Sequence, residues 1–210
     1  MSSEIKSTTV QTNSLKDKTG TRTLASDSGS AWSWGAGVPA DTIIQVKQTI
    51  KTDKEDITGT TGTNNHAFIP AQGGSGVFQE SITTTDSNKV LIDVRLNVSV
   101  SNGYAGTWAI FRGSATDTAI GSCTKIAVGT EASTNQSSAT CAIQPGSNSN
   151  SPLASSMLFL DSPSTGTHFY KIGWQAENGS SGYINRGANN ATNYYNGSFI
   201  SSITLYEVKA

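Results

Sequence analysis

The sequence is poor in several kinds of residue that common classes of protein require. Charged residues make up 14% of the 210 residues and hydrophobic residues 35%, both below the averages for soluble domains. A net charge of −1 leaves no basic field for nucleic acid and no polybasic patch for a membrane surface. The sequence also lacks a membrane-spanning apolar run and the apolar segment of a secretory signal. We therefore expect no nucleic-acid partner, no membrane insertion and no secretory leader.

Residues for catalysis and metal binding are scarce as well. The two histidines, His66 and His168, stand about a hundred residues apart and form no HxH or HExxH spacing. The sequence contains no GxSxG elbow, no phosphate-binding loop and no dinucleotide-binding fingerprint. Asp53, Glu55 and Asp56 cluster in one short loop, which does not predict the facing carboxylates of a glycosidase. These absences predict no metal, no cofactor and no enzymatic activity.

The sequence has only two cysteines, Cys123 and Cys141. A disulfide between them could close a hairpin, whereas the missing secretory leader favours two reduced thiols. The sequence leaves both alternatives open.

Alternating apolar residues and turn-forming residues are what the sequence does contain. The clearest alternation lies between Asn88 and Ser101. One parity carries Val90, Ile92, Val94, Leu96, Val98 and Val100, and the other carries Asp93, Arg95, Asn97 and Ser99. Most of the apolar residues are β-branched, which suits a strand with one face on a core. We expect this stretch to be a central strand of a sheet that faces solvent.

Further segments of strand-like pattern fill most of the chain after residue 40. They cover residues 41–52, 66–69, 77–85, 106–113, 118–130, 137–146, 154–162, 167–176, 182–186 and 197–208. Turns rich in Gly, Ser, Asn and Pro separate them, and no helical periodicity competes. The number and spacing of the segments predict an all-β fold, an antiparallel sandwich or jelly roll.

Residues 1–40 differ from residues 41–210 because their apolar residues are too widely spaced for a core of their own. We interpret them as an extended N-terminal arm attached to a β-sandwich domain. Trp32 and Trp34 either dock on the domain or a sister subunit, or anchor the arm to another protein, since aromatic residues are enriched at interfaces. The predicted anchor residues are Ile5, Val10, Leu15, Trp32 and Trp34.

Several strand-like segments carry apolar residues on both parities, whereas a solitary sandwich usually keeps one parity polar. We therefore expect identical subunits to cover some outward faces. The predicted interface residues are Trp108, Phe111, Tyr170, Trp174, Phe199 and Tyr206.

The segment from Ala176 to Ser198 has the composition of a binding loop, with tyrosines among many Asn and Gly residues. Aromatic rings and amides suit sugars, because rings stack on C–H surfaces and amides bond hydroxyls. The alternative is a buried strand at 182–186 with tyrosines packed at a loop base. The candidate surface-binding residues are Tyr183, Asn189, Asn190, Tyr194 and Tyr195.

Several stretches resemble virion-associated proteins of tailed bacteriophages, particularly marine phages of cyanobacteria. The stretches are VFQESITTTDSNKVLIDVRLNVSVS, GTWAIFRGSATDTAIG, SMLFLDSPSTGTHFYKIGWQAENGSSGYINR, SSITLYEV and the N-terminal SSEIKSTTVQ. The resemblance implies a tail or head fibre whose C-terminal domain is a jelly roll similar to the trimeric domains of tumour necrosis factor and C1q. The chain departs from the pattern in its Asn-rich insert after Arg186, which makes that insert the place where receptor specificity could vary.

The leading hypothesis is therefore a homotrimer that is assembled in the host cytoplasm and exposed on the virion. Residues 1–40 would attach to other virion proteins, and residues 41–210 would bind a host-surface glycan or protein. The alternatives are a passive decoration protein of the capsid or tail and, less favoured, a glycan-degrading tail spike.

Overall fold

The computed structural model describes most of the chain after residue 38 and three short backbone segments before it. The described residues are 39–57, 60, 65–101, 104–115, 119–130, 138–144, 152–188 and 197–210, with the backbone of 14–16, 23–27 and 32–34. Their regular structure is β, apart from the 3-10 helices η1 (Ile120–Ser122) and η2 (Glu177–Gly179). In these ranges no helix has the length and apolar character needed to cross a membrane.

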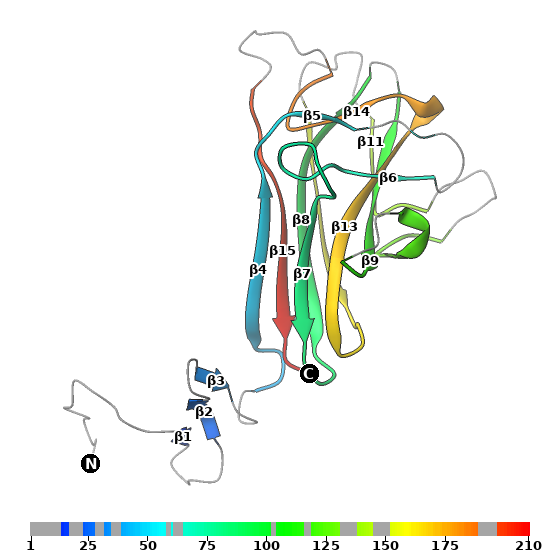
Figure 1. The fold of residues 1–210 in the computed structure, drawn as a ribbon. Coiled ribbons are helices and arrows are strands. Elements are labelled where there is room, and N and C mark those ends of the chain that lie inside the picture. Colours follow the sequence, from blue (N-terminus) through cyan, green and yellow to red (C-terminus); the bar gives the residue numbers. More distant parts are fainter. Residues whose placement is uncertain are drawn as a thin grey trace.

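Two six-stranded antiparallel sheets pack face to face (Figure 1). The first sheet contains β4 (Ile43–Lys51), β5 (Glu55–Ile57), β8 (Lys89–Val100), β12 (Leu153–Asp161), β14 (Gly182–Ile184) and β15 (Ser201–Val208). The second sheet contains β6 (Ala67–Phe68), β7 (Gln79–Thr84), β9 (Gly106–Gly113), β10 (Thr124–Ile126), β11 (Cys141–Ile143) and β13 (Gly166–Ala176).

The strand order is that of a jelly roll. The long strands of the first sheet lie in the order β4-β15-β8-β12, and the short β5 and β14 continue β4 and β15 at one end. In the second sheet β7 and β6 flank one side of β13, while β9 lies on its other side and carries β10 and β11 along its free edge. Because some short strands continue or share the place of others, each sheet has four strand positions side by side. Consecutive parts of the chain contribute alternately to the two sheets, which is the double-sheet jelly-roll arrangement. The predicted all-β sandwich is confirmed.

The N-terminal segments form a separate three-stranded antiparallel sheet of β1 (Ser14–Lys16), β2 (Thr23–Asp27) and β3 (Trp32–Trp34). The side chains of Leu15, Trp32 and Trp34 lie outside the described residues, as do Ile5 and Val10. The anchor role of these residues and the division at residue 40 therefore stay predictions.

The predicted strand at Asn88–Ser101 is confirmed as β8, and its alternation sets the core. All its even-numbered residues from Val90 to Val100 are buried between the sheets, whereas Leu91, Asp93 and Arg95 point away from the core. Burial of such apolar surface is the main stabilising term for a sandwich. The core also includes Phe78, Ile82, Trp108, Ile110, Tyr170, Ile172, Trp174, Ile203 and Leu205.

A buried polar cluster links the two sheets. Both guanidinium contacts of Arg112, in β9, go to Asp161, in β12, with Nη1 2.8 and 2.7 Å from the carboxylate oxygens. The hydroxyl of Tyr170 donates to the same carboxylate at 2.9 Å. Burial and the neighbouring Asp161 charge raise the pKa of Tyr170 far above its ordinary value. The cluster satisfies polar groups that would otherwise be costly between the sheets.

Four residues predicted at a subunit interface are instead buried within the single chain. Trp108, Tyr170 and Trp174 lie in the core between the sheets, and no more than 2% of Phe111 is exposed. Phe111 lies on the other side of β9, where His66 and Phe68 contact its ring edge-on. The interface prediction is therefore wrong for these four residues. The first sheet covers the inner faces of β9 and β13, and His66 and Phe68 cover Phe111 on the outward face.

Candidate functional site

The outward face of the first sheet, the face turned away from the core, carries an unusual concentration of exposed hydrophobic side chains. Seven large hydrophobic residues are exposed in the described part of the chain, and five of them point outward from the two edge strands. Three are on β4 and two on β12, with exposed fractions from 46 to 61%. They are Ile43, Val46, Ile50, Leu158 and Leu160.

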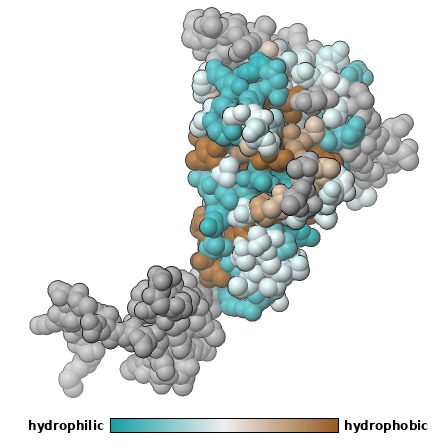
Figure 2. Space-filling view, viewed as in Figure 1, coloured by the Kyte–Doolittle hydropathy of each residue, from teal (hydrophilic) through white to brown (hydrophobic). Residues whose placement is uncertain are grey.

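Strand register arranges these residues in two stripes with a bridge between them. We call Ile43, Val46 and Ile50 the β4 stripe, and Leu158 and Leu160 the β12 stripe. Val46 lies opposite Tyr206, Tyr206 opposite Leu91, and Leu91 opposite Leu160. Because directly paired residues of antiparallel strands share a face, one apolar row crosses the whole sheet. Figure 2 shows hydrophobic atoms along the edge where β4 lies.

The middle of the same face is polar away from that row. Asp93 and Arg95 project from β8, and Thr204 lies opposite Asp93 on β15. Arg95 donates to the Asp93 carboxylate from Nη2 at 2.9 Å, with exposed side-chain fractions of 72% and 16%. We call these residues the polar strip. The first sheet thus exposes hydrophobic residues at both edges of its outward face and polar residues in the middle.

A buried lysine fixes which side of β4 faces outward. Lys51, on the parity opposite Val46 and Ile50, is fully buried. Its ammonium lies 2.7 Å from Asp53 Oδ1 and 3.1 Å from Glu55 Oε2, and it donates to the Ala71 carbonyl at 2.8 Å. Because Lys51 is buried together with its carboxylate partners, its side of β4 faces inward, and the side that carries Val46 and Ile50 faces outward. An alternation rule that places lysine in solvent would orient β4 the wrong way round.

The two carboxylates of this cluster have pKa values shifted in opposite directions. Burial alone would raise the pKa of Asp53, but hydrogen bonds from Lys51 and the Gly73 amide lower it overall. Burial raises the pKa of Glu55, and the neighbouring Asp53 adds to the increase. The acidic loop thus supplies the carboxylates that pair with the buried Lys51 of β4.

A second polar cluster holds the start of the Asn-rich insert. Asn185 is fully buried with φ of 60°, a left-handed conformation that Asn tolerates. Its Nδ2 donates to the carbonyls of Lys51 at 2.9 Å and Asp53 at 3.0 Å. Its Oδ1 accepts from Ser201 Oγ at 2.7 Å. The insert after Arg186 therefore starts from a rigid corner of the first sheet.

Only one of the predicted surface-binding residues falls within the described part of the chain. Tyr183 is half-buried in β14, with the Arg186 guanidinium 4.2 Å from its ring centre, a cation–π contact. Arg186 also pairs with Asp56. Asn189, Asn190, Tyr194 and Tyr195 lie outside the described residues. One face of the Tyr183 ring is thus occupied, and surface binding by this segment stays a prediction.

The remaining two predicted interface residues, Phe199 and Tyr206, are half-buried. Tyr206 belongs to the apolar row on the outward face, whereas Phe199 precedes β15 on the opposite parity. Of the six residues predicted at the interface, only Tyr206 thus joins the exposed apolar face.

Cys123 and Cys141 are both free thiols in this structure.

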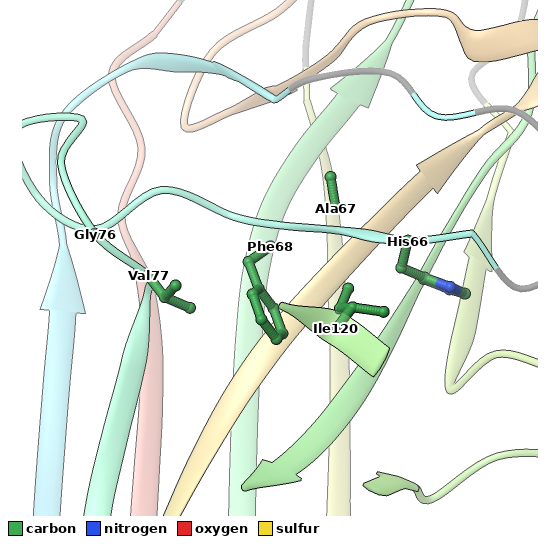
Figure 3. Close-up of a pocket in the computed structure, with 6 residues that line it drawn as sticks. All are labelled: His66, Ala67, Phe68, Gly76, Val77 and Ile120. Carbon is green, nitrogen blue, oxygen red and sulfur yellow. The ribbon is translucent and has the colours of Figure 1, made fainter. Parts of the chain in front are cut away.

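The outward face of the second sheet carries a pocket of about 460 Å³ (Figure 3). The side chains of His66, Phe68 and Ile120 converge on it, and Val77 forms its other wall. Its described lining contains no carboxylate or ammonium, so it offers apolar contact and an imidazole. The sequence does not reveal this pocket, because the pocket forms only when β6 and η1 fold back over β9 and β13.

Comparisons with known proteins place few limits on the function. No protein-family model matches the sequence, and no curated protein matches it. Among solved structures, that of infectious bursal disease virus, Gx strain, is similar with a TM-score of 0.34 and 13% identity, over 86% of this chain. The Gt strain structure gives a TM-score of 0.35 and 10% identity over 90% of the chain. This chain spans 38% and 44% of those two chains.

Proposed function

We propose that this chain is a structural subunit of a bacteriophage particle, a homotrimeric tail or head fibre whose jelly roll faces the host. The observation that carries the self-association is the exposed apolar row Val46–Tyr206–Leu91–Leu160 with its two stripes. Exposed apolar patches of this kind mark interaction surfaces in soluble proteins. The assignment to a phage virion rests on the resemblance of the sequence segments to phage virion proteins.

The proposed division of roles follows the chain. Residues 1–40 attach the trimer to other virion proteins, and the jelly roll presents the Asn-rich insert after Arg186 to a host-surface glycan or protein. The rigid corner at Asn185 supports this role, because a binding loop needs a fixed base. The proposal is non-enzymatic and requires no cofactor.

A passive decoration protein of the capsid or tail is the second candidate. It would share the apolar face and the attachment arm, and it would lack a receptor. A glycan-degrading spike is a third candidate, and incubation with host polysaccharide would reveal it through released product.

The oligomeric state is the first test of the proposal. Light scattering of the purified full-length chain at micromolar concentration should give the mass of three copies of the 21.9 kDa chain. A species at the mass of one chain across that concentration range would refute the homotrimer.

Attachment and receptor binding need particles. Deleting residues 1–40 should abolish incorporation into virions, and scrambling residues 187–197 should reduce adsorption without reducing incorporation. Normal adsorption by the scrambled particles would favour the passive decoration protein instead.

A further inference from the structure

The two ends of the sandwich have different connections to the rest of the chain. The start of β4 and the C-terminus lie together at one end, which we call the base (Figure 1). The amide of Asp41 donates to the Lys209 carbonyl at 2.8 Å, and the amide of Lys209 donates to the Thr42 carbonyl at 2.9 Å. Residues 1–40 therefore join the sandwich at its base.

The opposite end, which we call the far end, carries the start of the Asn-rich insert. Ser201, the first residue of β15, lies there opposite Lys51, the last residue of β4. The Phe199 amide donates to the Asn185 carbonyl at 3.3 Å, so the chain leaves and re-enters the sandwich at this end. The 12 residues of β8 run between the two ends, which puts them roughly 40 Å apart.

A buried polar cluster fastens the base. Glu207 Oε1 accepts from the Thr85 amide at 3.0 Å and from Asn88 Nδ2 at 2.8 Å. Asn88 Oδ1 accepts from the Ala210 amide at 3.1 Å. Both Glu207 and Asn88 are buried. These bonds fix the C-terminal end of β15 to the turn between β7 and β8.

Strands β4 and β15 connect residues 1–40 directly with the insert. They pair antiparallel through eight positions, from Ser201 opposite Lys51 to Val208 opposite Ile43. The chain enters β4 at the base and enters β15 at the far end. Opposing pulls on residues 1–40 and on the insert would therefore slide the two strands past each other. Hydrogen bonds of an antiparallel pair are perpendicular to the strands, so such a pull loads all of them at once.

Further contacts of both strands oppose the same sliding. The buried ammonium of Lys51 pairs with Asp53 and Glu55 at the far end of β4. Thr49 Oγ1, also on β4, donates to Glu80 Oε2 on β7 at 2.8 Å. The other edge of β15 pairs with β8 through seven positions. β15 is thus held between two strands, and β4 is the strand that a lengthwise pull would displace.

We propose that the β4–β15 pair bears force, carrying tension between a virion attached through residues 1–40 and a host surface bound by the insert. This inference rests on the proposed function, because it needs attachment at one end and host contact at the other. A pull between residues 1–40 and the C-terminus would act differently. Both points lie at the base, so the strands would separate one pair at a time, starting from Asp41 and Lys209.

Single-molecule pulling with optical tweezers compares the two directions. Both native cysteines are first replaced, through Cys123→Ser and Cys141→Ser. Handles at Ala40→Cys and Ser198→Cys then pull lengthwise, whereas handles at Ala40→Cys and Ala210→Cys pull at the base; all three positions are exposed. Assembly with an excess of unlabelled chain gives oligomers with one pair of handles. At equal pulling speed, the lengthwise unfolding force should be several times the force at the base.

The inference and the proposed function fail in different ways. A lengthwise unfolding force equal to or below the force at the base would overturn the force-bearing role, even if scrambling residues 187–197 reduces adsorption. Normal adsorption of the scrambled particles would refute host contact through the insert, and with it the tension, whatever force is measured. A high lengthwise force together with reduced adsorption is the result that we expect.

Discussion

The chain covers the outward face of the second sheet of this sandwich and leaves the outward face of the first sheet exposed. On the second sheet, Phe111 and Gly173 lie under His66, Phe68 and Ile120. On the first sheet, the hydrophobic residues of β4 and β12 stay exposed. The chain thus covers one hydrophobic face with its own segments and leaves the other exposed, and in the proposed homotrimer another copy would cover the exposed face.

Charge placement follows the same division. Lys171, on the covered face, is fully buried, donates to the Ser114 carbonyl at 2.8 Å and lies 5.7 Å from the Phe68 ring centre. Arg95, on the open face, remains largely exposed beside Asp93. The covered face thus behaves as a second, smaller core, and the open face behaves as a surface.

Truncation of Phe111 should show the largest difference between the faces. Phe111→Ala should lower the free energy of unfolding by about 3–5 kcal/mol, because it empties a packed site. Leu160→Ala on the open face should change the monomer by less than about 0.5 kcal/mol and weaken association instead. Urea unfolding and light scattering of both variants provide the comparison. Equal losses of stability would erase the distinction between the two faces.

Removing the buried ammonium tests what orients β4. Lys51→Met should cost on the order of 3 kcal/mol at neutral pH, because Asp53 and Glu55 lose their cation. Lys47→Met, an exposed lysine on the same strand, should cost less than about 0.5 kcal/mol. Urea unfolding measures both, and similar values for the two lysines would show that Lys51 does not determine the outward side of β4.

The pH dependence of the same variant has a defined sign. Asp53 has a lowered pKa in the folded chain, so its stabilisation is present above its unfolded pKa and is lost as the pH falls through the folded value. The difference between wild type and Lys51→Met should therefore shrink below about pH 4. A difference that stays constant down to pH 2 would mean that the carboxylates do not interact with Lys51.

A glycine on the covered face tests how tightly it is packed. A Cβ on Gly173 would lie 2.5 Å from Cε2 of Phe111, so Gly173→Ala should cost about 1–3 kcal/mol through overpacking. Gly121→Ala is a matched control, because nothing lies within 4 Å of its Cβ position. Thermal unfolding of both variants gives the comparison. A neutral Gly173→Ala would show that the covered face can open to accept a methyl group.

The tyrosine between the sheets should have the smallest effect, one that appears only at alkaline pH. Tyr170 has a raised pKa when folded, so its stabilisation is present below its unfolded pKa near 10 and declines as the pH rises above it. Between pH 9 and 11, wild type should lose about 1 kcal/mol more than Tyr170→Phe. Urea unfolding at both pH values measures this, and parallel losses would place the phenol in water.

The sequence predicted the inner half of the fold well and the outer surfaces poorly. The alternation in β8 identified its core residues, because one parity must face the core. The core residues Tyr170 and Trp174 of the 167–176 segment were instead predicted at a subunit interface. Alternation does not reveal the environments of Phe111 and Lys51, which come from His66, Phe68, Asp53 and Glu55. A loop that folds back over a sheet has no regular alternation of apolar and polar residues, so its sequence does not predict what it covers. Tyr206 lies on the parity opposite to that of Ile203 and Leu205, on the outward face, and its place at a subunit interface stays a prediction.

Hydroxyl-radical footprinting of the assembled chain tests the central claim most directly. In the wild type, the β4 and β12 stripes should be protected to the same degree as Phe111, because other copies cover the stripes and the chain itself covers Phe111. In a folded Leu158→Asp monomer, Val46, Ile50 and Leu160 should become labelled while Phe111 stays protected. Equal labelling of Val46, Ile50 and Leu160 in the wild type and in this variant would contradict the account.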